Sequence, residues 1–242
     1  MKVLVTFDID NTLIGHAKGG YSQNKAVSQA AFELLGIKQD IPSFIGCSFA
    51  GTTDYWIGQE IVKKACPNAD NTDELTQKFL QLEAKYFEIY DSQNFQVLPG
   101  VSRLLEHLVN LQNVEIALCT GNLEAIAWSK LRSVGIEKYF TKKYGGFGEI
   151  CERENVLKKA IESAEVGEKT HFNRLIHVGD AIQDEDAARR VGAIPICVET
   201  GHMVYKDFNG PCFVVKNFEE GFDDIVSVIK TGKAIHESVE KI

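Results

Sequence analysis

The feature that most constrains the fold of this chain is a set of short apolar segments separated by stretches of helical spacing. Residues 3–7, 114–119 and 175–178 are rich in apolar and β-branched side chains. They lack the strict alternation of a half-exposed strand, which is typical of strands buried on both faces of a sheet. Residues 194–198 and 213–215 are weaker candidates for further strands.

Helical patterns lie between these strand candidates, at residues 101–111, 123–134, 155–164 and 184–191. Strands that alternate with helices indicate a parallel sheet with helices on both faces. We therefore predict an α/β fold whose core is a doubly wound, Rossmann-like parallel sheet. Right-handed crossovers would place the carboxyl ends of all strands at one edge, where such folds bind ligands.

Residues 15–94 interrupt the alternation. They contain three helical patterns and no strand candidate between them, at residues 24–35, 53–64 and 75–90. A tolerated insertion leaves and rejoins its host domain at nearby points. The sequence therefore predicts a core domain made of residues 1–14 and 95–242, with an all-helical domain inserted at residues 15–94.

The net charge and the spacing of the cysteines indicate which cellular compartment and which classes of binding partner suit this chain. The 242 residues carry a formal net charge of −8, which lacks the basic footprint of a nucleic-acid protein and disfavours an anionic membrane surface. The six cysteines show no C-x-x-C or zinc-site spacing, which favours reduced thiols. No segment approaches the ~18 apolar residues of a membrane span, and the N-terminus lacks a signal-peptide pattern. We expect a cytoplasmic protein; nothing indicates its oligomeric state.

Chemistry-bearing residues follow three of the strand candidates. Asp8 and Asp10 come directly after the first, within Asp8-Ile9-Asp10-Asn11-Thr12. Thr120, Gly121 and Asn122 follow the second, where a hydroxyl and backbone N–H groups could hold a phosphate oxygen, although an ordinary helix cap has the same pattern.

The third strand candidate ends at another acidic motif. Asp180 and Asp184 follow residues 175–178, and taken alone they also fit a solvated turn with an acidic helix start. All three motifs should meet at one edge of the sheet. Four carboxylates there would repel one another without a cation, and oxygen ligands without Cys or His favour Mg²⁺.

Together these motifs resemble the haloacid dehalogenase superfamily of phosphohydrolases. D-x-D-x-T matches its first motif, Thr120 its second, and Gly179-Asp180-x-x-x-Asp184 its fourth. The helical insert resembles the C1-type cap of the family. The segment Gly51-Thr52-Thr53-Asp54 is similar to a cap segment of phosphoglycolate-phosphatase-like members.

The resemblance implies roles for these residues. Asp8 would be the nucleophile that forms an aspartyl-phosphate, and Asp10 would be the general acid and base. Mg²⁺ would be held by Asp8, Asp180 and the backbone carbonyl of Asp10, with support from Asp184. The phosphoryl group would contact Thr120, Gly121 and Asn122. As a hypothesis, Thr53 and Asp54 of the insert shape the substrate side, although a helix cap is an equally good reading of the pair.

The third motif departs from the family pattern. The family usually has a Lys, often Lys-Pro, before the helix that precedes the fourth motif, whereas residues 145–155 contain neither. Arg153 occupies the most comparable position, and Lys130 is a rival. Either residue would supply the catalytic cation, and each also fits a solvated helix face. Arg presents a planar fork of donors where Lys presents a point charge, so the exchange is not neutral.

The resemblance implies a Mg²⁺-dependent phosphatase that acts on a small phosphate ester, phosphoglycolate-like or a sugar phosphate. A phosphomutase of the β-phosphoglucomutase type has the same motifs and remains open. Two further alternatives carry less weight: a phospho-accepting signalling domain of the response-regulator kind, and a non-catalytic binding domain. The long helical insert and Asp10 disfavour the first, and the presence of every acidic position disfavours the second.

Overall fold

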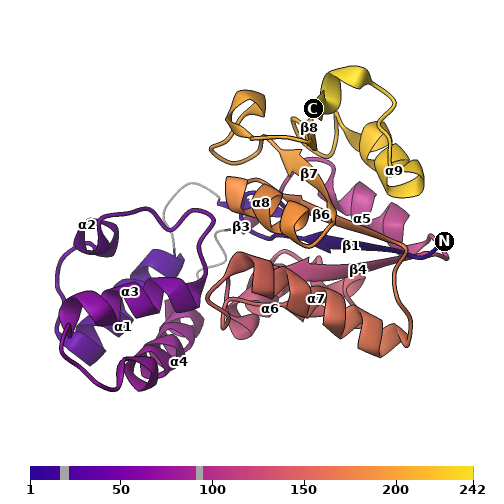
Figure 1. Cartoon of the computed structure of the whole chain (residues 1–242). Coiled ribbons are helices and arrows are strands. Elements are labelled where there is room, and N and C mark those ends of the chain that lie inside the picture. Colours follow the sequence, from indigo (N-terminus) through magenta and orange to yellow (C-terminus); the bar gives the residue numbers. More distant parts are fainter. Residues whose placement is uncertain (17–21, 91–94, 242) are drawn as a thin grey trace.

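The computed structural model describes residues 1–16, 22–90 and 95–241. Within these residues the main sheet has seven strands in the order β5–β4–β1–β6–β7–β8–β9 (Figure 1). Neighbouring strands are parallel except at the β8–β9 edge, where they are antiparallel. The strands are β1 (Val3–Phe7), β4 (Val114–Cys119), β5 (Gly145–Gly146), β6 (Arg174–Gly179), β7 (Ile194–Val198), β8 (Cys212–Val215) and β9 (Glu240–Lys241). The predicted α/β class is confirmed.

Helices cover both faces of this sheet. On one face, α5 (Val101–Val109), α6 (Glu124–Ser133) and α9 (Phe222–Thr231) pack in one cluster with Val5 and Phe7 of β1. On the other face, α7 (Arg153–Glu168) and α8 (Ile182–Arg190) enclose the smaller side chains of the sheet. Every residue of β1 is buried, which explains its uninterrupted apolar run and its central place between β4 and β6.

The insert is helical, as predicted. It contains α1 (Ser22–Leu35), α2 (Ile41–Ile45), α3 (Asp54–Ala65) and α4 (Thr72–Tyr90). In Figure 1 these four helices, which we call the cap, lie beyond one end of the sheet, and the N-terminus lies at the opposite end. Since β1 starts at the N-terminus, its carboxyl end points toward the cap.

A small second sheet at the base of the cap was not predicted. β2 (Ile14–His16) pairs antiparallel with β3 (Phe95–Val97), so the chain enters and leaves the cap side by side. Each strand has only three residues, which is too short to give a periodic signal. Because β2 extends to His16, it runs across the predicted boundary at residue 14, and the exact division into domains stays a prediction.

Some short or terminal elements were also not predicted from the sequence, namely α2, α9, β5 and β9. The described residues further contain three 3₁₀ turns, at Glu137–Tyr139, Tyr205–Asp207 and Glu237–Val239. Over the described ranges, no helix is both long and apolar enough to cross a membrane. The six cysteines, all in described segments, are unpaired thiols.

Candidate active site

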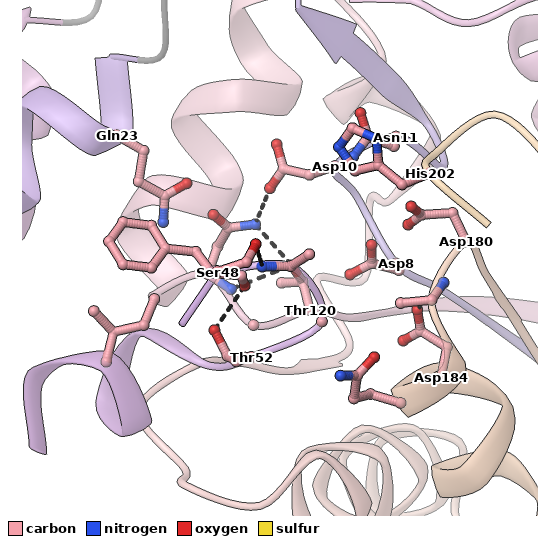
Figure 2. Close-up of a pocket in the computed structure, with 18 of the residues that line it drawn as sticks. Asp8, Asp10, Asn11, Gln23, Ser48, Thr52, Thr120, Asp180, Asp184 and His202 are labelled. Carbon is pink, nitrogen blue, oxygen red and sulfur yellow. Dashed lines mark hydrogen bonds between the residues drawn. The ribbon is translucent and has the colours of Figure 1, made fainter. Parts of the chain in front are cut away.

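Three neighbouring strands end at one point of the sheet, each with a polar residue. Asp8 follows β1, Thr120 follows β4 and Asp180 follows β6. Carboxylate oxygens of Asp8, Asp180 and Asp184 lie within 4.8 Å of one another, although Asp184 belongs to the first turn of α8. Figure 2 shows these carboxylates facing a common pocket. Topology thus brings the first and fourth sequence motifs together.

The carboxylate cluster is short of positive charge. Burial raises the pKa of Asp8 to about 6, with further repulsion from Asp184 and Asp10, despite the nearby Arg153 guanidinium. Burial, followed by repulsion from Asp8 and Asp184, raises the pKa of Asp180 to about 8. Buried oxygen ligands that repel one another form a donor set that suits a hard divalent cation. The residues present therefore fit Mg²⁺.

Arg153, the first residue of α7, bridges two of the carboxylates. Its Nη2 lies 2.5 Å from Oδ1 of Asp8 and 2.6 Å from Oδ1 of Asp184, and its Nε lies 2.9 Å from the same Asp184 oxygen. The Nη2 group also donates to the backbone carbonyl of Cys119. Although burial opposes it, the Arg153 and His177 neighbours hold the pKa of Asp184 well below its ordinary value. Asp184 is thus already paired, whereas the side-chain partner of Asp180 among residues 1–16, 22–90 and 95–241 is the uncharged Thr12.

The hydroxyl of Thr120 is oriented by Asn122. It accepts hydrogen bonds from the backbone N–H of Asn122 at 3.3 Å and from its side-chain Nδ2 at 2.8 Å. A hydroxyl has two acceptor positions and one donor proton, so both acceptor positions are occupied here. The Thr120 proton is left to donate into the pocket, where an anionic oxygen would accept it.

Lys130 lies in α6 and contacts Asp10. Its Nζ donates to the two carboxylate oxygens of Asp10 at 2.9 and 2.7 Å, to Oδ1 of Asn122 at 2.7 Å and to Oε1 of Gln23 at 2.7 Å. An ammonium has three donor hydrogens, so these acceptors use all of them, one being shared by the two Asp10 oxygens. Although burial opposes it, the Lys130 charge lowers the pKa of Asp10 below its ordinary value.

The two rival cations therefore occupy different positions. Arg153 faces Asp8, and Lys130 is fully buried against Asp10 with its hydrogens in use. Neither is on a solvated helix face. The carboxylate of Asp10 is also outside the cluster formed by Asp8, Asp180 and Asp184, which agrees with a metal-ligand role for its backbone carbonyl only.

Thr53 and Asp54 join the cap to the core. Thr53 is the N-cap of α3, where its hydroxyl accepts from the backbone N–H of Trp56 and donates to the carbonyl of Cys151. The backbone N–H of Asp54 donates to the carbonyl of Gly121 at 2.8 Å. Both side chains are buried and bonded to protein groups, so their predicted substrate-binding role stays a prediction.

Gly121 permits this close approach of cap and core. A Cβ atom at this position would lie 2.1 Å from the carbonyl oxygen of Thr52. Any larger residue would push the cap segment away from the loop that follows β4. The glycine that the sequence suggested for phosphate binding is thus also required for the contact between the two parts.

A cavity of about 370 Å³ lies between the cap and the strand ends. The core contributes the acidic cluster, the loop after β4 and the loop after β7, where His202 lies at the rim (Figure 2). The cap contributes both apolar residues, among them Phe49 and Ile57, and polar ones such as Gln23, Ser48 and Thr52. This volume suits a small molecule bound with one end at the carboxylates.

Sequence reasoning missed several residues around the site. His177 of β6 lies between Thr6 and Asp184, with its ring nitrogens 2.9 and 3.1 Å from their oxygens. Thr12 donates to Oδ1 of Asp180 at 3.3 Å, which gives the last residue of the first motif a partner. Gln23 contacts Lys130 from the cap. A buried His or a helical Gln carries no signal of its own, since only the fold supplies their neighbours.

Comparisons with known proteins agree with this geometry. A family model described as haloacid dehalogenase-like hydrolase matches residues 5–198. A search of curated proteins finds no significant match. Solved structures give full-length matches, among them a hydrolase from Pseudomonas syringae with a TM-score of 0.67 and 18% identity, covering 94% of this chain and 99% of its own.

Two further structures have similar values. A predicted phosphoglycolate phosphatase from Haemophilus somnus has a TM-score of 0.61 and 18% identity, with 93% of this chain and 96% of that chain covered. A β-phosphoglucomutase from a Pyrococcus species has a TM-score of 0.57 and 18% identity, with coverages of 95% and 99%. At such low identity these similarities establish the shared fold alone.

Proposed function

Because the chain belongs to the haloacid dehalogenase-like hydrolases, we propose that it is a Mg²⁺-dependent phosphatase of a small phosphate ester. The observation that carries this proposal is the contact between Arg153 and Asp8 beside the Asp180 carboxylate, at the floor of a small-molecule cavity. The resemblance read from the sequence motifs is confirmed at the level of the family.

The metal would be held by oxygen atoms of this cluster. The carboxylates of Asp8 and Asp180 and the backbone carbonyl of Asp10 would be its protein ligands. Asp184 would support the site through its contacts with Arg153 and His177. When bound, Mg²⁺ supplies positive charge that lowers the energy of a negatively charged phosphoryl group near Asp8.

The chain's own residues account for the transfer steps. Asp8 would attack phosphorus in line and become an aspartyl-phosphate while the ester oxygen leaves. Arg153 and the Thr120 hydroxyl would offset charge on the phosphoryl oxygens. Asp10, in the protonated form that its Lys130 partner makes a minority at neutral pH, would give its proton to the leaving oxygen and then take one from the water that releases phosphate. Lys130 and Asn122 would hold the Asp10 carboxylate in place, since they bond to both of its oxygens.

The cap, proposed as residues 15–94, would exclude water from the cavity during transfer. Phosphoglycolate-like molecules and sugar phosphates are the substrate classes that we propose. The family resemblance supports both, as do structural neighbours described as a predicted phosphoglycolate phosphatase and a β-phosphoglucomutase. A cytoplasmic location is supported by the unpaired cysteines.

Hydrolysis of p-nitrophenyl phosphate by the purified protein tests the proposal. We expect activity that EDTA removes and Mg²⁺ restores. Asp8→Asn should lower kcat by a factor of about 10⁴ or more without changing the far-UV circular dichroism spectrum. Asp186→Asn, a change of a half-buried residue on α8 whose carboxylate pairs with Arg189 outside the site, is the matched control and should retain activity. Appreciable turnover by Asp8→Asn would exclude Asp8 as the nucleophile.

A screen of phosphorylated metabolites would then identify the substrate. Release of inorganic phosphate from a sugar phosphate or from phosphoglycolate supports the phosphatase. Isomerisation of a sugar phosphate without phosphate release would instead identify a phosphomutase, the alternative that the motifs leave open.

A further inference from the structure

Gln23 connects the cap to the buried cation of the site. Three of the four acceptor atoms around Lys130 Nζ come from the core, two from Asp10 and one from Asn122. The fourth is Oε1 of Gln23, which lies in the first turn of cap helix α1. One cap residue thus completes the coordination of an ammonium that water does not reach.

The amide of Gln23 is itself held in one orientation. Its Nε2 donates to Oδ1 of Asp54 at 2.8 Å, and the other oxygen of Asp54 accepts from the backbone N–H of Leu123 at 2.7 Å. Since Leu123 directly precedes α6, which carries Lys130, the contacts form a closed chain from core to cap and back. Gln23 can take its place in this chain only while Asp54 is docked on the loop that follows β4.

If Gln23 is removed, Lys130 keeps its bonds to Asp10 and Asn122, and a further acceptor beside it is the buried carboxylate of Glu83 in α4. The Nζ of Lys130 lies 5.9 and 5.6 Å from the ring centres of Phe87 and Phe95, which supply no hydrogen-bond acceptor of normal strength. A buried ammonium that loses an acceptor shifts toward those that remain. The Asp10 carboxylate, whose side chain is 29% exposed, has room to follow. Loss of the Gln23 contact would therefore displace the Asp10 carboxylate, which is the proposed general acid and base.

We propose that Gln23 is a positioning residue that acts through Lys130 to hold Asp10 in the orientation for proton donation when the cap is docked. The inference rests on the proposed phosphatase function. Gln23 also lines the cavity (Figure 2), so a substrate contact is the competing role. The two roles predict different losses of activity. If Gln23 positions Asp10, the loss should be larger for a leaving group that needs more protonation. If Gln23 contacts the substrate, the loss should be similar for both leaving groups.

The test compares p-nitrophenyl phosphate with phenyl phosphate. The two esters are similar in shape, but phenolate is the more basic leaving group and requires more protonation from Asp10. We expect Gln23→Leu to lower kcat/KM for phenyl phosphate by about tenfold or more, a part of the usual 10²–10⁴-fold effect of a general acid. The p-nitrophenyl ester should lose less than about threefold. The inhibition constant for inorganic phosphate should stay unchanged.

Two variants control this result. Gln29→Leu makes the same chemical change six residues along α1, outside the lining of the cavity, and should leave both substrates unaffected. Gln23→Glu keeps an oxygen for Lys130 but loses the Nε2 donor to Asp54, so it should retain only part of the phenyl phosphate activity that Gln23→Leu loses. Equal losses for both esters in Gln23→Leu would overturn the positioning role. A wild-type protein that hydrolyses neither ester would overturn the phosphatase itself.

Discussion

Lys130 and Asp10 lie 120 positions apart in the sequence and form an ion pair in which the ammonium is completely buried. Arg153 makes a separate pair with Asp8. The two Asp residues of the first motif thus have one cation each. The sequence left Arg153 and Lys130 as alternative candidates for the catalytic cation. The geometry shows that Arg153 faces Asp8 and that Lys130 faces Asp10.

The first prediction concerns the stability that Lys130 provides. Lys130→Met should lower the free energy of unfolding by about 3 kcal/mol, because it leaves the Asp10 carboxylate without its buried partner. Urea unfolding at neutral pH in EDTA measures this change. Lys63→Met removes an exposed lysine that bonds Glu60 on α3 and should stay within about 0.5 kcal/mol of wild type. Similar losses in both variants would contradict a structural role for the buried pair.

The second prediction separates the charge of Arg153 from its shape. Arg153→Ala should lower kcat for p-nitrophenyl phosphate by about 10²–10³-fold, the usual effect of removing a group that stabilises developing charge. Arg153→Lys keeps the charge, but one ammonium cannot reproduce the planar fork that contacts both Asp8 and Asp184. It should therefore have intermediate activity.

Arg190→Ala is the control for this series. Arg190 lies at the end of α8 with a side chain that is 68% exposed and pairs only loosely with Glu154. Its removal should not change kcat. Full activity of Arg153→Ala would show that another group offsets the charge at Asp8.

The third prediction follows from the raised pKa of Asp180. A carboxyl whose pKa rises from 3.8 when unfolded to about 8 when folded binds its proton more tightly in the folded state. The metal-free protein should therefore lose stability as the pH rises between these values. Asp180→Asn removes this loss. In EDTA its Tm should gain on wild type between pH 5 and pH 8.

Added magnesium should raise the Tm of wild type relative to that of Asp180→Asn, the reverse of the effect of pH in EDTA. At pH 8, added Mg²⁺ should raise the Tm of wild type and leave Asp180→Asn nearly unchanged, because the variant lacks a metal ligand. Asp186→Asn, at a half-buried position of α8 that pairs with Arg189 and not with the cluster, should behave as wild type in both conditions. A Tm response to Mg²⁺ that survives in Asp180→Asn would place the metal elsewhere.

The central strands could be predicted because burial on both faces leaves a visible apolar run. Residues 3–7 and 114–119 coincide with β1 and β4 for this reason. The acidic motifs could be placed at one edge because parallel topology fixes where strands end. By contrast, β2 and β3 were missed, since three residues that pair far along the chain leave no local pattern.

The supporting residues of the site could not be predicted for a related reason. Gln23 acquires its significance from Lys130 and Asp54, which lie 107 and 31 positions away. For Lys130 the sequence left a catalytic cation and a solvated helix face open, and its burial comes from contacts with Gln23, Phe87 and Phe95 that the sequence pattern does not contain. Side-chain networks between two parts of a fold depend on their docking, which no periodicity encodes.

Glu83 of cap helix α4 is fully buried, and among the described residues neither of its carboxylate oxygens has a hydrogen bond of good geometry, although Gln23 lies close to it. Burial, with repulsion from Asp54, raises its pKa well above the ordinary 4.5, although Gln23 and Lys130 oppose the shift. Glu149 adds weaker repulsion. The folded protein should therefore hold Glu83 as the neutral acid at moderately acidic pH.

The fourth prediction uses this pH dependence. Because the folded state retains the Glu83 proton, wild type should lose stability as the pH rises above 4.5 toward the raised pKa, by up to about 1.4 kcal/mol per pH unit. Glu83→Gln cannot ionise, so its stability relative to wild type should increase between pH 5 and pH 8 in urea unfolding. Glu88→Gln, an exposed change on the same helix, should show no such trend. A pH-independent difference for Glu83→Gln would mean that Glu83 ionises as readily in the folded protein as in the unfolded chain.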